Sequence, residues 1–257
     1  MKPATTVTKV CRVLAELKGR PSLGLTDVAR RADLLPSDVH RILTSLQAYG
    51  YVEQDVNTKR YSIGYGLLSL GLNTLHRSLL QKKGLPILFR LSEACETTAH
   101  LAVFDRRQMN VVLISQVEFA GEGPFEGALG DIKAGHCTAL GKAVMANVDA
   151  KTRSMALEKS GLARSTRHTT TGLRALDREF QKIKKLGYAV DREEMTESAC
   201  CMGSCMVDGT GALVGAISIT MSARRFAACQ ESHLANQVRS AASKLSVALG
   251  YPRPNEE

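Results

Sequence analysis

Three of the seven cysteines, Cys200, Cys201 and Cys205, lie within six residues of one another. Thiols at this density can bind a metal ion, form a disulfide, act as a nucleophile, or belong to a buried strand. The stretch contains no C-x-x-C pair, and neighbouring strand residues point to opposite faces, so only Cys201 and Cys205 can share a face. No Lys, Arg or His lies beside them in the sequence to lower a thiol pKa. The pattern favours a strand and predicts neither a metal site nor a catalytic residue.

Hydroxyl groups and a helix start offer a second kind of chemistry. Ser218 and Thr220 occupy alternate positions of a predicted strand, 212–220, so both hydroxyls face one side of the sheet. Thr138 and the small residues after it open a predicted helix, 138–146, whose first N–H groups have no partner within the helix. Because the helix dipole is positive there, a carboxylate can bind to these groups. These residues indicate a binding site for a small anion.

Two charged residues belong to the same part of the sequence. An ionised Asp191 would repel an anionic ligand, so we expect it either to accept a hydrogen bond from a ligand hydroxyl or to fix nearby backbone. Both alternatives stay open. Lys142 could pair with an anion, but beside Gly141 on a helix we expect it to face solvent.

A polar helix face lies near the N-terminus. The apolar residues Val39, Ile42, Leu43 and Leu46 would pack inward, opposite Ser37, Asp38, His40, Arg41, Thr44 and Ser45. A DNA recognition helix needs such a face, because it presents polar side chains to the major groove. Arg41 can bind a guanine edge or a phosphate. Asp38 suits the helix dipole but repels phosphate, unless it accepts from cytosine N4.

The elements around this helix form a recognisable order. A helix over 10–17 is followed by a short helix that Thr26 is expected to cap, and Ser37 is expected to cap the recognition helix. Strands at 51–54 and 60–63 then form a hairpin with basic residues near its tip. This order predicts a winged helix-turn-helix domain over residues 1–63. The expected DNA-binding residues are Thr26, Ser37, Asp38, His40, Arg41, Thr44, Ser45, Lys59 and Arg60.

Residues 64–80 are rich in leucine and have too little polar surface for an isolated helix. We expect a linker helix here that packs against a partner. Residues 81–257 alternate helical and strand patterns, with a glycine-rich loop at 118–131 and a hairpin turn at 208–211. They predict an α+β domain on an antiparallel sheet.

The net charge of the 257-residue chain is +9. Residues 1–75 contain ten Lys and Arg against six Asp and Glu, and residues 76–257 contain 24 against 19. Positive charge is thus denser in the first segment, as a polyanion partner would favour. There is no apolar run of the roughly 18 residues that a membrane span needs and no export signal, so we expect a cytoplasmic protein without a membrane partner.

Four segments resemble the IclR type of bacterial transcriptional regulator. They are residues 34–46 (LLPSDVHRILTSL) followed by 50–52 (GYV), 61–64 (YSIG), 136–143 (HCTALGKA) and 187–194 (GYAVDREE). The sequence departs from the family pattern at Asp38, usually Thr, at Ser198, usually Gly, and at Cys205, usually Pro. We expect the first to affect the operator sequence and the other two the pocket shape, with Cys205 setting this protein's ligand choice apart.

The resemblance implies a GAF-like second domain that binds a small organic acid and mediates dimer and tetramer contacts. By resemblance, its ligand contacts are Ala139, Leu140, Asp191, Cys201, Ser218 and Thr220, and it needs no cofactor or metal. A dimer would then read a pseudo-palindromic operator on double-stranded DNA. Effector binding would act through the linker helix.

Two other classes of protein remain as alternatives. An enzyme could use Cys201 with His136 as a nucleophile pair on a small carboxylate, although no G-x-S-x-G, P-loop or H-E-x-x-H motif is present. A protein-interaction module would use the apolar helix at 64–80 but would leave the polar helix face and the pocket residues without a role.

Overall fold

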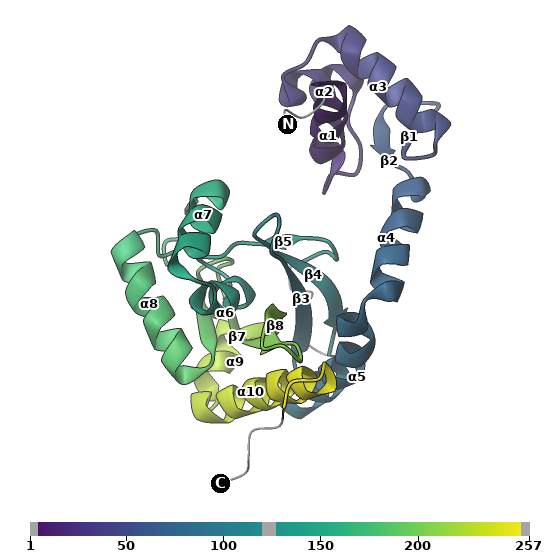
Figure 1. The fold of residues 1–257 in the computed structure, drawn as a ribbon. Coiled ribbons are helices and arrows are strands. Elements are labelled where there is room, and N and C mark those ends of the chain that lie inside the picture. Colours follow the sequence, from purple (N-terminus) through teal and green to yellow (C-terminus); the bar gives the residue numbers. More distant parts are fainter. Residues whose placement is uncertain (1–4, 120–126, 253–257) are drawn as a thin grey trace. The chain divides into compact units, whose positions relative to one another are not determined.

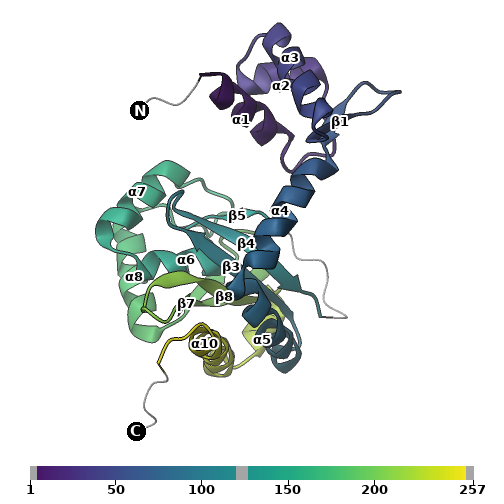
Figure 2. The ribbon, with the colours of Figure 1, turned by 45° about the vertical axis from the view of Figure 1, so that its right-hand side comes forward.

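The computed structural model describes residues 5–119 and 127–252, and the chain divides into two compact units, Met1–Arg77 and Ser78–Glu257. Figures 1 and 2 show the elements of each unit from two sides. The predicted fold class is confirmed: the first unit holds a helix-turn-helix with a two-stranded wing, and the second is an α+β unit on an antiparallel sheet.

The N-terminal unit contains four helices and one hairpin among its described residues. They are α1 (Thr5–Leu17), α2 (Leu25–Ala32), α3 (Pro36–Ala48), β1 (Val52–Gln54), β2 (Tyr61–Ile63) and α4 (Tyr65–Arg77). The apolar faces of α1, α2 and α3 meet in one core, with Val13, Val28, Val39 and Leu43 fully buried. The helical spacing of apolar residues in the sequence thus accounts for this core.

Two helices begin differently from the prediction. The N-cap of α2 is Gly24 and that of α3 is Leu35, and neither cap makes a side-chain hydrogen bond. The expected capping roles of Thr26 and Ser37 are therefore wrong. Pro36 explains the second case, because its fixed φ and missing N–H suit the first helical position and start the helix one residue before Ser37 could cap it.

Glycines fix the junction between α3, the hairpin and α4. A Cβ on Gly64 would lie 2.3 Å from the carbonyl oxygen of Gly50, and one on Gly66 would lie 2.8 Å from it. The Gly66 amide donates to the same oxygen at 2.9 Å. Only residues without a side chain allow this approach, which explains the glycine of the YSIG segment. Helix α4 lies within the predicted 64–80 segment, and a separate helix begins at Leu79.

The C-terminal unit contains six helices and six strands among its described residues. They are α5 (Leu79–Cys95), β3 (Thr98–Asp105), β4 (Asn110–Val117), β5 (Ile132–Lys133), α6 (Ala139–Asn147), α7 (Ala150–Ser160), α8 (Leu173–Leu186), β6 (Ala189–Arg192), β7 (Ala199–Val207), β8 (Leu213–Ser222), α9 (Ala223–Ala228) and α10 (Glu231–Ala248). The sheet order is β5-β4-β3-β8-β7-β6, with every pair antiparallel.

Helices cover both faces of this sheet. Helices α5 and α10 pack on one face, whereas α6 packs on β7 and β8 from the other and carries α8 on its outer side (Figures 1 and 2). One hydrophobic core lies between α6, α8 and the sheet and includes Leu113, Val144 and Phe180. This arrangement places the start of α6 over the middle of the sheet.

Several elements differ from their predicted bounds. Helix α7 and the short strand β5 were not predicted. The sequence predicts one final helix over about 227–249, whereas the structure has two, α9 and α10, separated before Glu231. The predicted loop 118–131 includes residues 120–126, which lie outside the described residues. In the described part of the chain, no helix is long and apolar enough to cross a membrane.

Candidate functional site

One cavity of about 350 Å³ in the C-terminal unit brings together all six residues predicted to contact a ligand. Strands β6, β7, β8 and β3 form its floor, and the start of α6 lies above it. Its lining comprises Ala139, Leu140, Asp191, Cys201, Ser218 and Thr220, together with His100, Lys133, Thr138, Met195, Thr196, Glu197, Ser198 and Ala199. The first six come from four separate elements, so strand alternation alone could not have shown that they converge.

Strand register explains why the floor of the cavity is polar. Asp191 lies opposite Cys201, which lies opposite Thr220. In the next row, Ser218 lies opposite both Gly203 and His100. Because residues two apart on a strand share a face, both rows point toward α6.

The following row of the same face is apolar and belongs to the core. Cys205 lies opposite Ala216, which lies opposite Ala102, and all three pack in the core beneath α6 and α8. Cys205 is therefore outside the cavity wall, and the expectation that it sets ligand choice is wrong. The parity argument placed it on the correct face but could not show how far the cavity extends along the strand.

The start of α6 offers hydrogen-bond donors to the cavity. Thr138 is the N-cap: its hydroxyl accepts from the Gly141 amide at 3.0 Å and donates to the Ala134 carbonyl at 2.8 Å. The amides of Ala139 and Leu140 are the remaining donors of the first turn, and both residues line the cavity. A Cβ on Gly203 would lie 3.1 Å from the Ala139 carbonyl, so this glycine lets the helix start approach the sheet.

The charged groups of the cavity are unevenly distributed. Lys133 extends from β5 with its side chain 16% exposed and lies 3.5 Å from Asp131. His100 has its pKa lowered to about 4 by burial and by the nearby Lys133 charge, so the imidazole is neutral at pH 7. Sequence reasoning missed both residues, because they reach the cavity from the two strands β3 and β5, which held no motif.

Asp191 fixes backbone, as one of the two alternatives proposed. Its Oδ1 accepts from the Glu194 amide at 2.7 Å, and the residue is 2% exposed. Burial raises the pKa of this carboxyl from 3.8 to about 7, although the backbone hydrogen bonds and Lys142 act in the opposite direction. The group can therefore exchange a proton near neutral pH.

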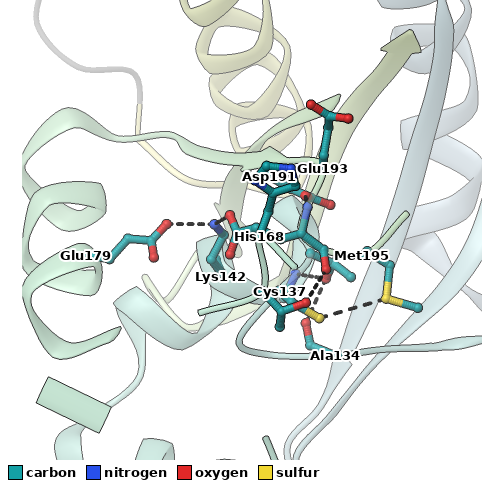
Figure 3. A network of polar contacts seen from close by, with 12 residues as sticks. Ala134, Cys137, Lys142, His168, Glu179, Asp191, Glu193 and Met195 are labelled. Carbon is teal, nitrogen blue, oxygen red and sulfur yellow. Dashed lines mark hydrogen bonds and ion pairs between the residues drawn. The ribbon is translucent and has the colours of Figure 1, made fainter. Parts of the chain in front are cut away.

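The segment Met195–Ser198 lines one edge of the cavity, here called the cavity mouth, and a network of polar contacts holds the two residues before it (Figure 3). The Thr166 hydroxyl donates to the Glu193 carbonyl at 2.6 Å, and the Thr169 hydroxyl donates to the Glu194 carbonyl at 2.7 Å. Ser198 has φ of +64°, a left-handed conformation that favours glycine. This explains why a glycine is usual at this position in the family that the sequence resembles.

The prediction that Lys142 faces solvent is wrong. Its side chain is 0% exposed, and its Nζ lies 2.6 Å from Glu179 Oε1 and 2.5 Å from Glu194 Oε1 (Figure 3). Burial by itself would lower the pKa of Lys142, but the two carboxylates raise it, so the ammonium stays charged. The signal that could have found this is a single charge within the otherwise uncharged helix ALGKAVMAN. The ion triad joins α6, α8 and the cavity mouth.

Cys201 and His136, the alternative nucleophile pair, each contact other groups. Cys201 Sγ lies 3.1 Å from Thr220 Oγ1, and burial raises its pKa far above the ordinary range of a thiol. His136 Nε2 lies instead 3.0 Å from the Ala163 carbonyl, and His136 does not line the cavity. The structure therefore does not bring the alternative nucleophile pair together. Within the described ranges no group of three His, Cys, Asp or Glu could hold a metal ion, and all seven cysteines are free thiols.

The polar face of α3 is largely open to solvent. Ser37, His40, Arg41, Thr44 and Ser45 are exposed. Thr44 and Ser45 donate their hydroxyls to the carbonyls of His40 and Arg41, each at 2.9 Å. Asp38 differs: it is half-buried and binds Lys9 Nζ at 2.6 Å, which lowers its pKa. In the structure, Asp38 thus joins α3 to α1 through this ion pair.

The wing and α2 carry the other predicted contacts. Thr26 is exposed on α2, and Lys59 is exposed at the hairpin with φ of +57°. Arg60 is exposed, but its Nε donates to Ser22 Oγ at 3.1 Å and a terminal nitrogen donates to the Ser22 carbonyl at 3.0 Å. Arg60 therefore anchors the wing to the loop before α2, and Lys59 is the more available of the two cations.

Two family models match the chain. The model described as "Bacterial transcriptional regulator IclR C-terminal" matches residues 72–247, and that described as "IclR helix-turn-helix domain" matches residues 6–56. Among curated proteins, the HTH-type transcriptional regulator BhcR of Paracoccus denitrificans is 31% identical over 88% of this chain and 81% of its own length. The transcriptional repressor IclR of Escherichia coli is 28% identical over 95% of this chain and 89% of its own length.

Solved structures agree with the fold. The IclR protein of Thermotoga maritima is 29% identical with a TM-score of 0.71, over 96% of this chain and 99% of that one. An IclR homologue from Microbacterium hydrocarbonoxydans, complexed with 4-hydroxybenzoate, is 20% identical with a TM-score of 0.79. The match covers 95% of this chain and 99% of that one. The second likeness bears on the fold alone.

Proposed function

Because the chain belongs to the IclR family of bacterial transcriptional regulators, we propose that it binds an operator through α3 and responds to a small organic acid held in the cavity. The relatives are named as transcriptional regulators and repressors, which supports a regulator and not an enzyme. Gene regulation by DNA binding is the function of the family. The effector, the contact residues and the assembly are proposals for this chain.

The observation that carries the effector proposal is the convergence of three anion-binding features on one cavity. The Ala139 and Leu140 amides at the start of α6, the Lys133 ammonium, and the hydroxyls of Ser218 and Thr220 all line it. Amides at a helix start favour an anion, and a largely buried ammonium adds a full positive charge. A carboxylate bound here would be held from the helix, from β5 and from β8 together.

The opposite side of the cavity favours a polar group without negative charge. Asp191 and Glu197 line that side, and an ionised Asp191 would repel a second carboxylate. With its raised pKa, the neutral Asp191 carboxyl can also donate a hydrogen bond. An acid with a second, uncharged polar group would suit both sides of the cavity. The 4-hydroxybenzoate bound by the Microbacterium homologue, with a carboxylate and a hydroxyl at opposite ends, is one candidate of this kind.

For DNA, we propose that Arg41 reads a base edge and that Ser37, His40, Thr44 and Ser45 complete the contact surface of α3. These side chains are exposed on one helix face whose opposite side is fully packed. Lys59 would contact the phosphate backbone from the wing. We propose that Asp38, Arg60 and Thr26 lie beside this contact surface and contribute less to DNA binding. Asp38 and Arg60 already have partners within the domain.

We further propose that two copies act together on a pseudo-palindromic operator. Leu68, Leu70 and Leu72 on α4 are 51%, 53% and 43% exposed, which suits a helix that packs against a second copy. Two identical recognition helices would then read two half-sites. An acid that binds one arrangement of the dimer more tightly would shift the population toward it and so change operator affinity.

A binding experiment tests the proposal. The full-length protein would first select a duplex from a random DNA pool, and that duplex would then be titrated with and without each of a panel of small carboxylic acids, 4-hydroxybenzoate included. We expect one or more acids to raise the melting temperature and to change DNA affinity, because a ligand of the folded state stabilises it. A protein that selects DNA but binds none of the acids would contradict the effector part alone.

A variant pair then tests the cavity. Lys133→Met should weaken binding of such an acid by about 10- to 100-fold, as expected for a charge-assisted hydrogen bond, and should leave its neutral amide unaffected. Lys83→Met, an exposed lysine on α5, is the matched control. Equal affinities of both variants for the acid would place the ligand elsewhere.

A further inference from the structure

Positive charge in the C-terminal unit is concentrated in one segment. Residues 149–185 contain ten Lys and Arg against four Asp and Glu, a net charge of +6. The C-terminal unit, residues 78–257, contains 23 Lys and Arg against 19 Asp and Glu, a net charge of +4, so the rest of this unit has a net charge of −2. Helices α7 and α8 with their connecting loop therefore hold the entire positive excess of this unit.

Four of these cations form a stripe along α8. Arg174, Arg178, Lys182 and Lys185 are all exposed. At about 100° per residue, they fall within an arc of about 80°. The buried residues of α8 point the other way, toward α6 and the sheet: Leu176, Phe180 and Ile183. In Figure 1, α8 lies on the outer side of α6, so this basic stripe faces away from the core.

The acidic residues of α8 do not neutralise the basic stripe. Asp177 and Glu179 flank it on its two sides, and each pairs with a cation from another helix. Asp177 lies 3.7 Å from Arg153 of α7, whose guanidinium also lies over the Phe180 ring. Glu179 lies 2.6 Å from the buried Lys142 of α6. Within residues 5–119 and 127–252, none of the four stripe cations forms an ion pair.

Such a stripe has a cost within the isolated unit. Cations four residues apart on a helix, as Arg174, Arg178 and Lys182 are, repel one another and destabilise it. Among the described residues of the unit, no ion pair offsets this repulsion. A polyanionic partner bound along the stripe would offset this repulsion.

We propose that the basic stripe binds DNA backbone phosphates, in the part of the duplex beyond the bases that α3 contacts. Stable protein–protein interfaces have an apolar or aromatic centre, whereas no apolar residue of α8 falls within the arc of the basic stripe. Backbone binding needs only regularly spaced Lys and Arg, and its free energy comes from released counterions. A protein of this family acts on DNA, so a polyanion is available when it functions.

The test uses two duplexes and three proteins. One duplex is the sequence that the protein selects from a random pool, and the other is that sequence with about 20 base pairs of unrelated DNA on each side, enough for several further phosphate contacts. The stripe variant is R174Q/R178Q/K182Q/K185Q. The control is K82Q/K83Q/R90Q/K244Q, which removes the same charge from exposed positions on α5 and α10.

We expect the wild type and the control to bind the longer duplex about 10-fold more tightly than the short one, and the stripe variant to lose this gain. The slope of log affinity against log salt on the longer duplex should fall by about 0.9 for each lost phosphate contact. All three proteins should bind the short duplex equally, which shows that operator reading is intact. The proposal is overturned if the stripe variant keeps the gain and the slope, if the control loses as much, or if the wild type gains nothing from the flanks.

Discussion

Five of the six polar residues predicted on α3 are exposed, whereas Asp191, Ser218 and Thr220 in the cavity are at most 6% exposed. The α3 residues come from one helix, and the Thr44 and Ser45 hydroxyls bond within it. The cavity residues come from separate strands, and their placement depends on register and on the helix above them. A surface of the first kind tolerates substitution without loss of the fold. A cavity of the second kind connects ligand binding to stability.

The largest expected effect is a loss of stability in the C-terminal unit, which holds the cavity, with none in the N-terminal unit, which holds α3. Lys142→Met leaves Glu179 and the buried Glu194 without their cation, so the free energy of unfolding of the C-terminal unit should fall by about 3–5 kcal/mol. The N-terminal unit should keep its stability. Hydrogen exchange along a urea series measures both units in one experiment.

The exposed Lys151→Met on α7 is the control for Lys142→Met and should change stability by less than about 0.5 kcal/mol. The double variant Lys142→Met/Glu194→Gln should recover part of the loss, because it removes the uncompensated buried charge. Equal losses in Lys142→Met and Lys151→Met would show that the ion triad does not support the unit.

The second effect concerns pH. The pKa of Asp191 is raised from 3.8 to about 7, so the folded state holds this proton more tightly than the unfolded chain. This group therefore lowers the free energy of unfolding as the pH rises from about 4 through about 7. Asp191→Asn keeps an acceptor for the Glu194 amide and removes the titration. Its stability relative to the wild type should increase by about 2 kcal/mol between pH 5 and pH 8.

Urea unfolding at the two pH values measures this difference. Glu158→Gln removes an exposed carboxylate on α7 and is the matched control, which should follow the wild type at both values. Parallel stability curves for Asp191→Asn and the wild type would mean that this carboxyl is not the group that couples the cavity to pH.

The third expected effect concerns DNA binding by the exposed face of α3. Arg41→Ala should weaken specific DNA binding by about 10- to 100-fold, the range for one lost bidentate base contact, and should leave unfolding unchanged. Arg90→Ala on α5 removes an equally exposed arginine and should bind as the wild type does. Gel-shift titrations on a selected duplex measure both. Full affinity in Arg41→Ala would remove α3 from the contact surface.

The smallest effect tests a single hydroxyl. Ser218→Ala should weaken binding of a carboxylic acid effector about 3- to 10-fold, as expected for one hydrogen bond, without changing DNA affinity in the absence of the acid. Ser243→Ala, on the exposed side of α10, is its control. Calorimetric titration measures the affinities, and identical values for Ser218→Ala, Ser243→Ala and the wild type would show that this strand does not contact the ligand.

The sequence was sufficient where local patterns determine structure. Apolar residues at helical spacing predicted α3 and its packed side, and alternation placed Cys201, Ser218 and Thr220 on one face. Sequence reasoning failed where residues far apart in the chain determine the position of a side chain. A buried Lys142 requires Glu179 and Glu194, which are 37 and 52 residues away. Lys133 and His100 reach the cavity only through the packing of β3, β4 and β5, and the position of Cys205 depends on where the core begins.

Met195, Thr196 and Ser198 line the cavity, while Thr166, Thr169, Asp191 and the Lys142–Glu194 pair hold the backbone beside them. The frame and the variable surface are thus formed by different residues. A combinatorial library restricted to positions 195 and 196 would vary the cavity lining and leave Ser198, whose backbone is left-handed, unchanged. This division makes the C-terminal unit a suitable starting point for biosensors that report new metabolites.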